Sequence, residues 1–262
     1  MATSRRDLLK LGSALTASAA FGNRVLAQTD PTAGLIFPPL DYPIPPDAKE
    51  LFPSGLRFIS NGVGFSGMTI EGYEEAIPRV LPRAADLASE GADLISVFGS
   101  SITFYRGAEF NQALTDMVTA HTGLPATTQS NGLLDGLRHV NARRVAVATA
   151  YTDEVTGRLK IFLEEHGFQV VSARGLGYVR IPEGAATQPI LHELGEAAYA
   201  EANRADALVM SCGALRTLDL LVPLEGSIGV PVVSSTPHGL WHCARMLGLA
   251  AKVQGYGMVM EA

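Results

Sequence analysis

Residues 205–212, ADALVMSC, line up with residues 92–99, ADLISVFG, and this pair of stretches decides the fold. In each, a short apolar run follows Ala-Asp, which predicts a buried strand. An Ala-rich helical stretch precedes each one, and a Gly-x-Pro sequence that starts another strand follows, at 123–125 and 229–231. Because the same features occur twice in the same order, we expect two similar α/β halves that face each other across a cleft. The alternative is that any two βα units look alike at this level.

Other extended apolar runs predict further strands, and helical patterns separate them. These runs are residues 33–37, 145–150, 169–172 and 230–233. Continuous Val, Ile and Leu runs between helices are typical of buried parallel strands. The sequence therefore predicts an α/β fold of two pseudo-twofold lobes, each a parallel sheet flanked by helices, with the active site in the interlobe cleft. We expect residues 31–141 to form the first lobe, with 235–262 packing back on it, and residues 142–234 to form the second.

Three helical patterns are specific enough to compare with a structure. Residues 69–91 have apolar side chains at helical spacing, and Pro78 and Pro82 predict a kink or a shortened helix. A later helix ends at Gly167, which suits the residue that follows a helix. Between them, another helix should carry Phe110, Leu114 and Met117 on one face.

Composition and charge exclude some classes of protein. The chain has 262 residues, of which 47% are hydrophobic and 18% charged, and this favours a packed globular core. A formal net charge of −6, with no basic run beyond the first ten residues, argues against a nucleic-acid partner. No 18-residue apolar stretch is suited to spanning a bilayer, so we expect no membrane association of the mature chain.

The N-terminus predicts export. Residues 4–10, SRRDLLK, have the form of a twin-arginine signal, and a weakly apolar stretch and a small-residue cleavage site, 25–27, follow in the right order. We therefore expect residues 1–30 to be a leader and linker, the twin-arginine export machinery to be a partner of the precursor, and the periplasm to be the location. If the leader is not functional, the chain is cytoplasmic, and the Arg-Arg pair is then a chance feature of a helix.

Four sites at strand ends carry the candidate chemistry. Cys212 ends a strand, and Gly213 begins a turn that we expect to open a helix, whose N–H groups would lower the pKa of the thiol. Gly99-Ser100-Ser101 ends the equivalent strand, where two hydroxyls can bind an anion. Tyr151 can donate a hydrogen bond, and Pro38-Pro39 offers rigid apolar walls. The alternatives are a buried structural cysteine, a plain Ser N-cap, a Tyr that covers the sheet and an ordinary loop.

The two cysteines and six histidines leave few other possibilities. In an oxidising compartment, Cys212 and Cys243 could instead form a disulfide. His238 and His242 have the i,i+4 spacing of helical metal ligands, but only Cys243 lies nearby as a further ligand, so we expect no metal site. No G-x-G-x-x-G nucleotide loop follows the first strand, so the sequence gives no sign of a dinucleotide site.

Together these segments resemble the arylmalonate decarboxylases of the aspartate/glutamate racemase (maleate isomerase-like) superfamily. The similarity covers residues 33–256 and is carried by Pro38-Pro39, EGY at 71–73, GSSITFYRGA at 99–108, Ala148-Thr149-Ala150-Tyr151, Ser211-Cys212-Gly213 and PVVSS at 231–235. Three positions depart from the family pattern: Ser100 replaces Thr, Phe65 replaces a smaller aliphatic residue, and Ala214 replaces Gly.

The resemblance implies a cofactor-free carboxy-lyase that acts on disubstituted malonates, with a small dicarboxylate as substrate. It places the catalytic thiol at Cys212 and the donors that bind the developing anion at Ser100, Ser101 and Tyr151. The substrate-binding residues that it implies are Gly99, Gly213, Pro38, Pro39, Phe65, Met68, Tyr73, Ala150 and Ile181. Racemases and maleate isomerases of the superfamily use two thiols, and Gly99 stands in the place of the second. Two alternatives remain: an isomerase or racemase of small dicarboxylates, and an exported solute-binding protein for organic acids.

Overall fold

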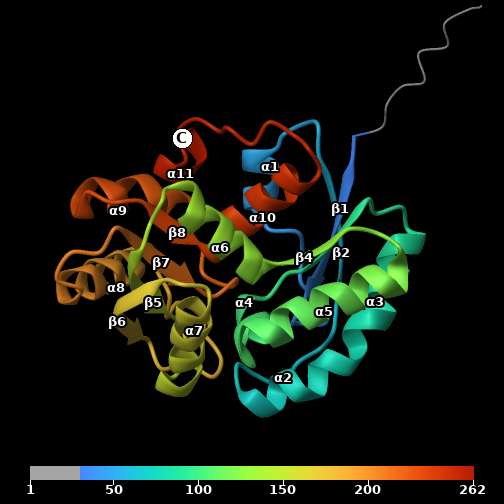
Figure 1. Ribbon diagram of the computed structural model, residues 1–262, viewed down its shortest axis with the longest axis horizontal. Helices are drawn as coiled ribbons and strands as arrows, with labels where there is room; N and C mark the ends of the chain where they lie inside the picture. Colours follow the sequence, from blue (N-terminus) through green and yellow to red (C-terminus); the bar gives the residue numbers. More distant parts are fainter. Residues whose placement is uncertain (1–29) are drawn as a thin grey trace, which may run out of the picture.

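The computed structural model describes residues 30–262, which form two lobes, each built on a four-stranded parallel sheet (Figure 1). The strand order is β2-β1-β3-β4 in the first lobe and β6-β5-β7-β8 in the second, so the predicted repeat and fold class are confirmed. The strands are β1 Thr32–Phe37, β2 Arg57–Gly62, β3 Leu94–Val97, β4 Ala126–Thr128, β5 Arg144–Thr149, β6 Gln169–Gly175, β7 Ala207–Ser211 and β8 Val232–Ser234. The two Ala-Asp stretches supply β3 and β7, which take equivalent places in their sheets.

The repeated Ala-Asp pair has the same structural role in both lobes. Asp93 Oδ2 accepts a hydrogen bond from the Thr32 N–H, at 2.8 Å. Asp206 Oδ2 accepts from the N–H groups of Arg143 and Arg144, at 2.9 and 2.8 Å, and these bonds hold the pKa of Asp206 below its usual range. Each carboxylate thus satisfies N–H groups where the neighbouring central strand begins, and this ties β3 to β1 and β7 to β5.

Helices cover both sheets, and two of them pack together between the lobes. The helices are α1 Pro46–Leu51, α2 Ile70–Ala76, α3 Val80–Ser89, α4 Ser100–Phe104, α5 Gly107–Thr122, α6 Gln129–His139, α7 Asp153–Glu165, α8 Gln188–Glu201, α9 Leu221–Ile228, α10 Ser235–Met246 and α11 Met258–Glu261, with 3₁₀ turns η1 Ile77–Arg79 and η2 Leu218–Leu220. Helix α6 packs against β8 and α10 against β3, and the two helices pack closely on each other (Figure 1). Glycine permits this approach, because a Cβ at Gly132 would lie 2.8 Å from the carbonyl oxygen of His238.

The interruption predicted within residues 69–91 is confirmed: the segment forms three pieces, α2, η1 and α3, because Pro78 interrupts the hydrogen-bond ladder. Other local features were not predicted. Met117 does not face inward: it is 44% exposed, whereas Leu114 and Val118 are buried. The sequence analysis missed β2, an edge strand with only partly buried side chains.

The predicted leader lies outside the described residues. Within residues 30–262, no helix combines the length and apolar character needed to cross a membrane.

Candidate active site

A cavity with an empty volume of about 430 Å³ lies between the lobes, where strands of both sheets end. Ten of the sequence-predicted site residues line it: Pro38, Pro39, Phe65, Met68, Gly99, Ser100, Ser101, Tyr151, Cys212 and Gly213. The first lobe supplies the prolines and serines, and the second supplies the tyrosine and the cysteine. The cavity therefore needs both halves of the repeat, as expected for ligand sites at the carboxyl ends of parallel strands.

Cys212 follows β7 directly and is only 6% exposed. A turn follows it rather than the expected helix, and the next helical residues begin at Leu218. Burial raises the pKa of the thiol to about 11, although hydrogen bonds from the Ala214 N–H, the Tyr151 hydroxyl and the Leu215 N–H oppose this shift. The backbone N–H groups lower the pKa as the sequence analysis expected, but desolvation outweighs them and the pKa is raised overall. At neutral pH, Cys212 is a protonated thiol, and its Sγ donates to Met68 Sδ at 3.7 Å.

Four hydroxyl groups meet beside the thiol. Ser100 Oγ lies 3.1 Å from the Tyr151 hydroxyl and 3.1 Å from Ser235 Oγ. Ser211 Oγ lies 3.2 Å from Ser100 Oγ and 3.4 Å from the Tyr151 hydroxyl. Burial raises the pKa of Tyr151 well above its usual value, with the Cys212 charge adding to the shift. All four groups are therefore neutral donors at pH 7, able to turn their protons toward an anion.

Gln129, at the start of α6, links this hydroxyl cluster to the turn after the thiol. Its Oε1 accepts a hydrogen bond from the Ser100 N–H at 2.8 Å, and its Nε2 donates to Thr236 Oγ1 at 3.3 Å. A Cβ at Gly213 would lie 2.9 Å from the same Oε1. Gly213 is thus needed to make room for the Gln129 amide, a reason that the sequence did not reveal.

The place opposite the thiol holds no second sulfur. Gly99 precedes α4, in the position equivalent to Cys212, and a Cβ there would lie 2.4 Å from Pro38 Cγ. The Pro38 ring thus occupies the space that a side chain at residue 99 would need, and the two cysteines are both free and buried, so the disulfide alternative is wrong. Cys243 lies within α10, where burial raises the pKa of its thiol to about 12.

Three predicted substrate-binding residues do not line the cavity. Tyr73 is fully buried and its ring is stacked on that of Phe65, 6.5 Å between centroids, so it supports the wall from behind. Ala150 is fully buried, and its backbone groups bond to Ser211 and Tyr178. Ile181 lies in the loop between β6 and α8, and packs against the core.

Sequence reasoning missed several residues of the site. Phe37, Phe98 and Tyr42 also line the cavity, and Ser211, Ser235 and Gln129 organise the hydroxyls. Ala214, which the sequence analysis named as a departure from the family pattern, lines the cavity as well. Position was an available signal for Gln129 and Ser235, since each directly follows a strand, β4 or β8, at the same edge of its sheet. Tyr42 had no such signal, because it lies in an irregular loop.

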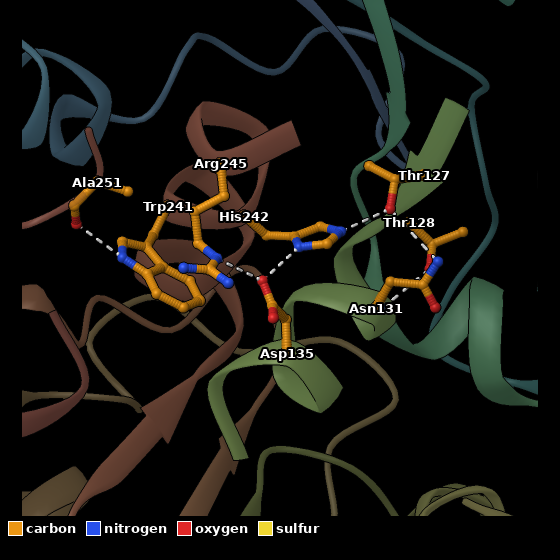
Figure 2. Close-up of polar contacts among 8 residues, drawn as sticks. All are labelled: Thr127, Thr128, Asn131, Asp135, Trp241, His242, Arg245 and Ala251. Carbon is orange, nitrogen blue, oxygen red and sulfur yellow. Dashed lines mark hydrogen bonds and ion pairs between the residues drawn. The ribbon is translucent and has the colours of Figure 1, made fainter. Parts of the chain in front are cut away.

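The two histidines with metal-ligand spacing make other contacts. His242 Nε2 lies 2.9 Å from Thr127 Oγ1 and its Nδ1 lies 2.9 Å from Asp135 Oδ2, which also accepts from Arg245 (Figure 2). His238 is fully buried, and its Nδ1 lies 2.9 Å from the Ser234 N–H. Within residues 30–262, no group of three or more His, Cys, Asp or Glu side chains is placed to hold a metal ion.

Comparison with known proteins agrees with this geometry. The chain matches the arylmalonate decarboxylase family over residues 33–260. It is 42% identical to an arylmalonate decarboxylase from Bordetella bronchiseptica over 88% of this chain and 97% of that protein. A solved arylmalonate decarboxylase in its liganded form, a Gly-to-Cys and Cys-to-Ser double mutant, superposes with a TM-score of 0.85 at 41% identity, over 88% of this chain and 99% of that one.

A more distant structure shares the fold. It is a Cys-to-Ser mutant of Nocardia farcinica maleate cis-trans isomerase with a covalently bound succinylcysteine intermediate. It is 21% identical, with a TM-score of 0.78, and the match covers 88% of this chain and 98% of that one. The two-lobed architecture is therefore common to an arylmalonate decarboxylase and a maleate isomerase.

Proposed function

The chain belongs to the arylmalonate decarboxylase family, and from this premise we propose that it removes one carboxylate from disubstituted arylmalonates and yields a chiral monocarboxylic acid and CO₂. The observation that carries the proposal is a single protonated thiol, Cys212, beside a cluster of neutral hydroxyl donors in an otherwise apolar interlobe cavity. This arrangement can stabilise an anion and protonate it without a cofactor.

Ser100, Ser101 and Tyr151 hold the carboxylate that stays. All three line the cavity, and Ser100 and Tyr151 are already within 3.1 Å of each other. A bound carboxylate would accept hydrogen bonds from these donors in place of their bonds to one another. As negative charge builds on the held carboxylate, these donors stabilise the transition state more than the ground state.

The carboxylate that leaves faces the apolar walls. The side chains of these walls have no N–H or O–H donor for a charged group, so the charge of this carboxylate is poorly solvated there. These side chains belong to Pro38, Pro39, Phe65 and Met68. When the carbon–carbon bond breaks, CO₂ departs and the electron pair of that bond passes into the held carboxylate. The product of this step is an enediolate, with its charge among the hydroxyl donors.

Cys212 then acts as the general acid. Its raised pKa of about 11 keeps the proton on sulfur at neutral pH, which suits a donor rather than a nucleophile. The thiol delivers that proton to the α-carbon, and the thiolate regains one from water. Since one thiol reaches one face of the enediolate, we expect a single enantiomer.

The direct test is CO₂ release from α-methyl-α-phenylmalonate by the wild type and by Cys212→Ser. The proposal requires release by the wild type and its loss in the variant. Deuterium exchange at the α-carbon of small dicarboxylates without CO₂ release would point to an isomerase or racemase instead. Tight carboxylate binding that Cys212→Ser leaves unchanged, without turnover, would point to a solute-binding protein.

We also propose that the twin-arginine export machinery carries the folded precursor to the periplasm. The support is the order of residues 4–27: an Arg-Arg pair, a weakly apolar stretch and a small-residue cleavage site. Substitution of both Arg5 and Arg6 by Lys should move the protein from the periplasmic to the cytoplasmic fraction. An unchanged distribution would contradict export by this route.

A further inference from the structure

A second cavity adjoins the active site. It has an empty volume of about 320 Å³, and Tyr42, Gly213 and Ala214 line both cavities. The Tyr42 ring packs against Phe37 of the active-site wall, with 4.9 Å between centroids. The two cavities therefore share one wall, formed by Tyr42, Gly213 and Ala214.

The second cavity contains an unpartnered buried carboxyl group. Asp47 is 7% exposed and lines this cavity. Its Oδ1 is buried and has no hydrogen-bond partner among the described residues, which carries a free-energy cost. Burial raises the pKa of Asp47, and the nearby Glu50 and Asp219 charges add to this shift. A group that donated a hydrogen bond to Asp47 would remove this cost.

Arg216 supplies the complementary donor. Within residues 30–262, it is the one cationic side chain that lines either cavity. It lines the second cavity together with Asp47 and Tyr42, and its positive charge opposes the rise that burial causes in the pKa of both groups. Thr236 also lines the second cavity, and its Oγ1 donates to the Gly213 carbonyl at 2.9 Å. This bond fixes the backbone that both cavities share.

We propose that this cavity is a subsite for a neutral hydroxyl group at the far end of the substrate's aryl substituent. A hydroxyl can donate to Asp47 and accept from Arg216 at the same time. A methyl group would leave Asp47 Oδ1 unpaired, and a second carboxylate would meet Asp47, Glu50 and Asp219 as well as the one arginine. The inference rests on the proposed decarboxylation and names its substrate class, hydroxyarylmalonates.

The experiment compares kcat/KM for CO₂ release from α-methyl-α-phenylmalonate and its hydroxyl, methyl and carboxyl ring derivatives, substituted at the 3- or 4-position. Wild-type enzyme should prefer the better hydroxyl derivative over its methyl counterpart by roughly 10- to 100-fold, because a site built to bond a hydroxyl discriminates against analogues that lack it. Arg216→Gln and Asp47→Asn should each reduce that ratio to near 1 and leave kcat/KM for the unsubstituted substrate within about twofold.

Arg158→Gln is the matched control, since it removes one exposed arginine from α7, away from both cavities. It should keep the full hydroxyl preference. Equal rates for hydroxyl and methyl derivatives in the wild type, or a preference that survives both Arg216→Gln and Asp47→Asn, would overturn the subsite while decarboxylation itself stands. Absence of CO₂ from every compound would overturn the proposed function, and the subsite with it.

Discussion

At the scale of single residues, neighbouring side chains have separate tasks in the proposed reaction. Ser101 and Tyr151 stabilise charge on oxygen, whereas Cys212 supplies a proton to carbon. Ser101→Ala and Tyr151→Phe should each lower kcat by about 10²–10³, the usual cost of losing one oxyanion donor. The kcat of Cys212→Ser should fall further, because a hydroxyl is a weaker acid than a thiol. Steady-state CO₂ release measures kcat for all three variants.

Two matched variants separate chemistry from packing. Tyr105 is buried outside the cavity and its hydroxyl has no partner among the described residues, so Tyr105→Phe makes the same change as Tyr151→Phe without touching the site. Cys243→Ala likewise removes the other thiol. Both should retain wild-type kcat. If Cys243→Ala is as inactive as Cys212→Ser, the two cysteines act as a pair and the assignment of Cys212 is wrong.

The protonation state of Cys212 can be measured directly. Since burial raises the pKa of this thiol to about 11, little thiolate is present at neutral pH. Alkylation by iodoacetamide should therefore be slow at pH 7 and rise as pH approaches 11. Cys212→Ala should show no alkylation of the folded protein, because Cys243 is fully buried. If the alkylation rate reached half of its maximum below pH 8, the hydrogen bonds from the backbone donors would affect the pKa of Cys212 more than desolvation does.

At the scale of secondary-structure elements, the contact between α6 and α10 depends on glycine. A Cβ at Gly132 would lie 2.8 Å from the His238 carbonyl and 2.9 Å from Gly239 Cα, and both are backbone atoms that cannot rotate away. Gly132→Ala should thus destabilise the protein by roughly 1–3 kcal/mol, the cost of overpacking. Gly157, within α7, has open space at its Cβ, so Gly157→Ala should stabilise by about 0.5–1 kcal/mol through helix propensity alone. Urea unfolding measures both, and a stabilised Gly132→Ala would contradict the close contact.

The elements that the sequence predicted well are those whose own residues specify them. Strands β3 and β7 are continuous apolar runs, and the repeated Ala-Asp pair marks where each begins. Strand β2 was missed because its sequence, RFISNG, mixes polar and apolar residues, and only pairing with β1 makes it a strand. The exposure of Met117 on α5 was not predicted, because helical spacing alone does not say where the core is.

Within the site, strand ends were predictable and tertiary contacts were not. Gly99 and Cys212 were found because each ends a repeated strand, and both line the cavity. The sequence indicated the N–H groups that lower the pKa of Cys212 but not the larger effect of desolvation, because desolvation depends on what surrounds the thiol in three dimensions. Tyr42 reaches the site from an irregular loop, which no local pattern indicates, whereas Gln129 directly follows β4 and its position at the strand end was a signal that the sequence analysis did not use.

At the scale of the whole molecule, a cluster of polar contacts joins helix α10 to helix α6 and strand β4 of the first lobe. Asp135 of α6 accepts from His242 and Arg245 of α10, and His242 also contacts Thr127 of β4 (Figure 2). Burial alone would raise the pKa of Asp135, but the hydrogen bond from His242 and the charges of His242 and Arg245 outweigh it, so the pKa is lowered.

This cluster of contacts predicts acid sensitivity. A carboxyl group whose pKa is lower in the folded than in the unfolded state stabilises the fold at pH values above its unfolded-state pKa, about 3.9. This stabilisation is lost as the pH falls through the folded-state pKa. Asp135→Asn should therefore reduce the free energy of unfolding at pH 6 by on the order of 1–3 kcal/mol. The difference in free energy of unfolding between wild type and variant should decrease from pH 5 toward pH 2. A difference that stayed constant with pH would show that the carboxylate charge contributes nothing to stability.

The pseudo-twofold relation of the lobes gives the last prediction. Residue 99 is the counterpart of Cys212, so Gly99→Cys should place a second thiol on the opposite face of the substrate. Protonation from either face would then lower the enantiomeric excess of the product. Because Pro38 Cγ lies 2.4 Å from the Cβ position, the proline must move, and kcat should fall in the single variant. Gly99→Cys combined with Pro38→Ala should recover part of that loss and keep the low enantiomeric excess. Chiral chromatography of the product decides between the outcomes: an enantiomeric excess that matches the wild type in both variants would mean that the two lobes do not present equivalent positions to the substrate.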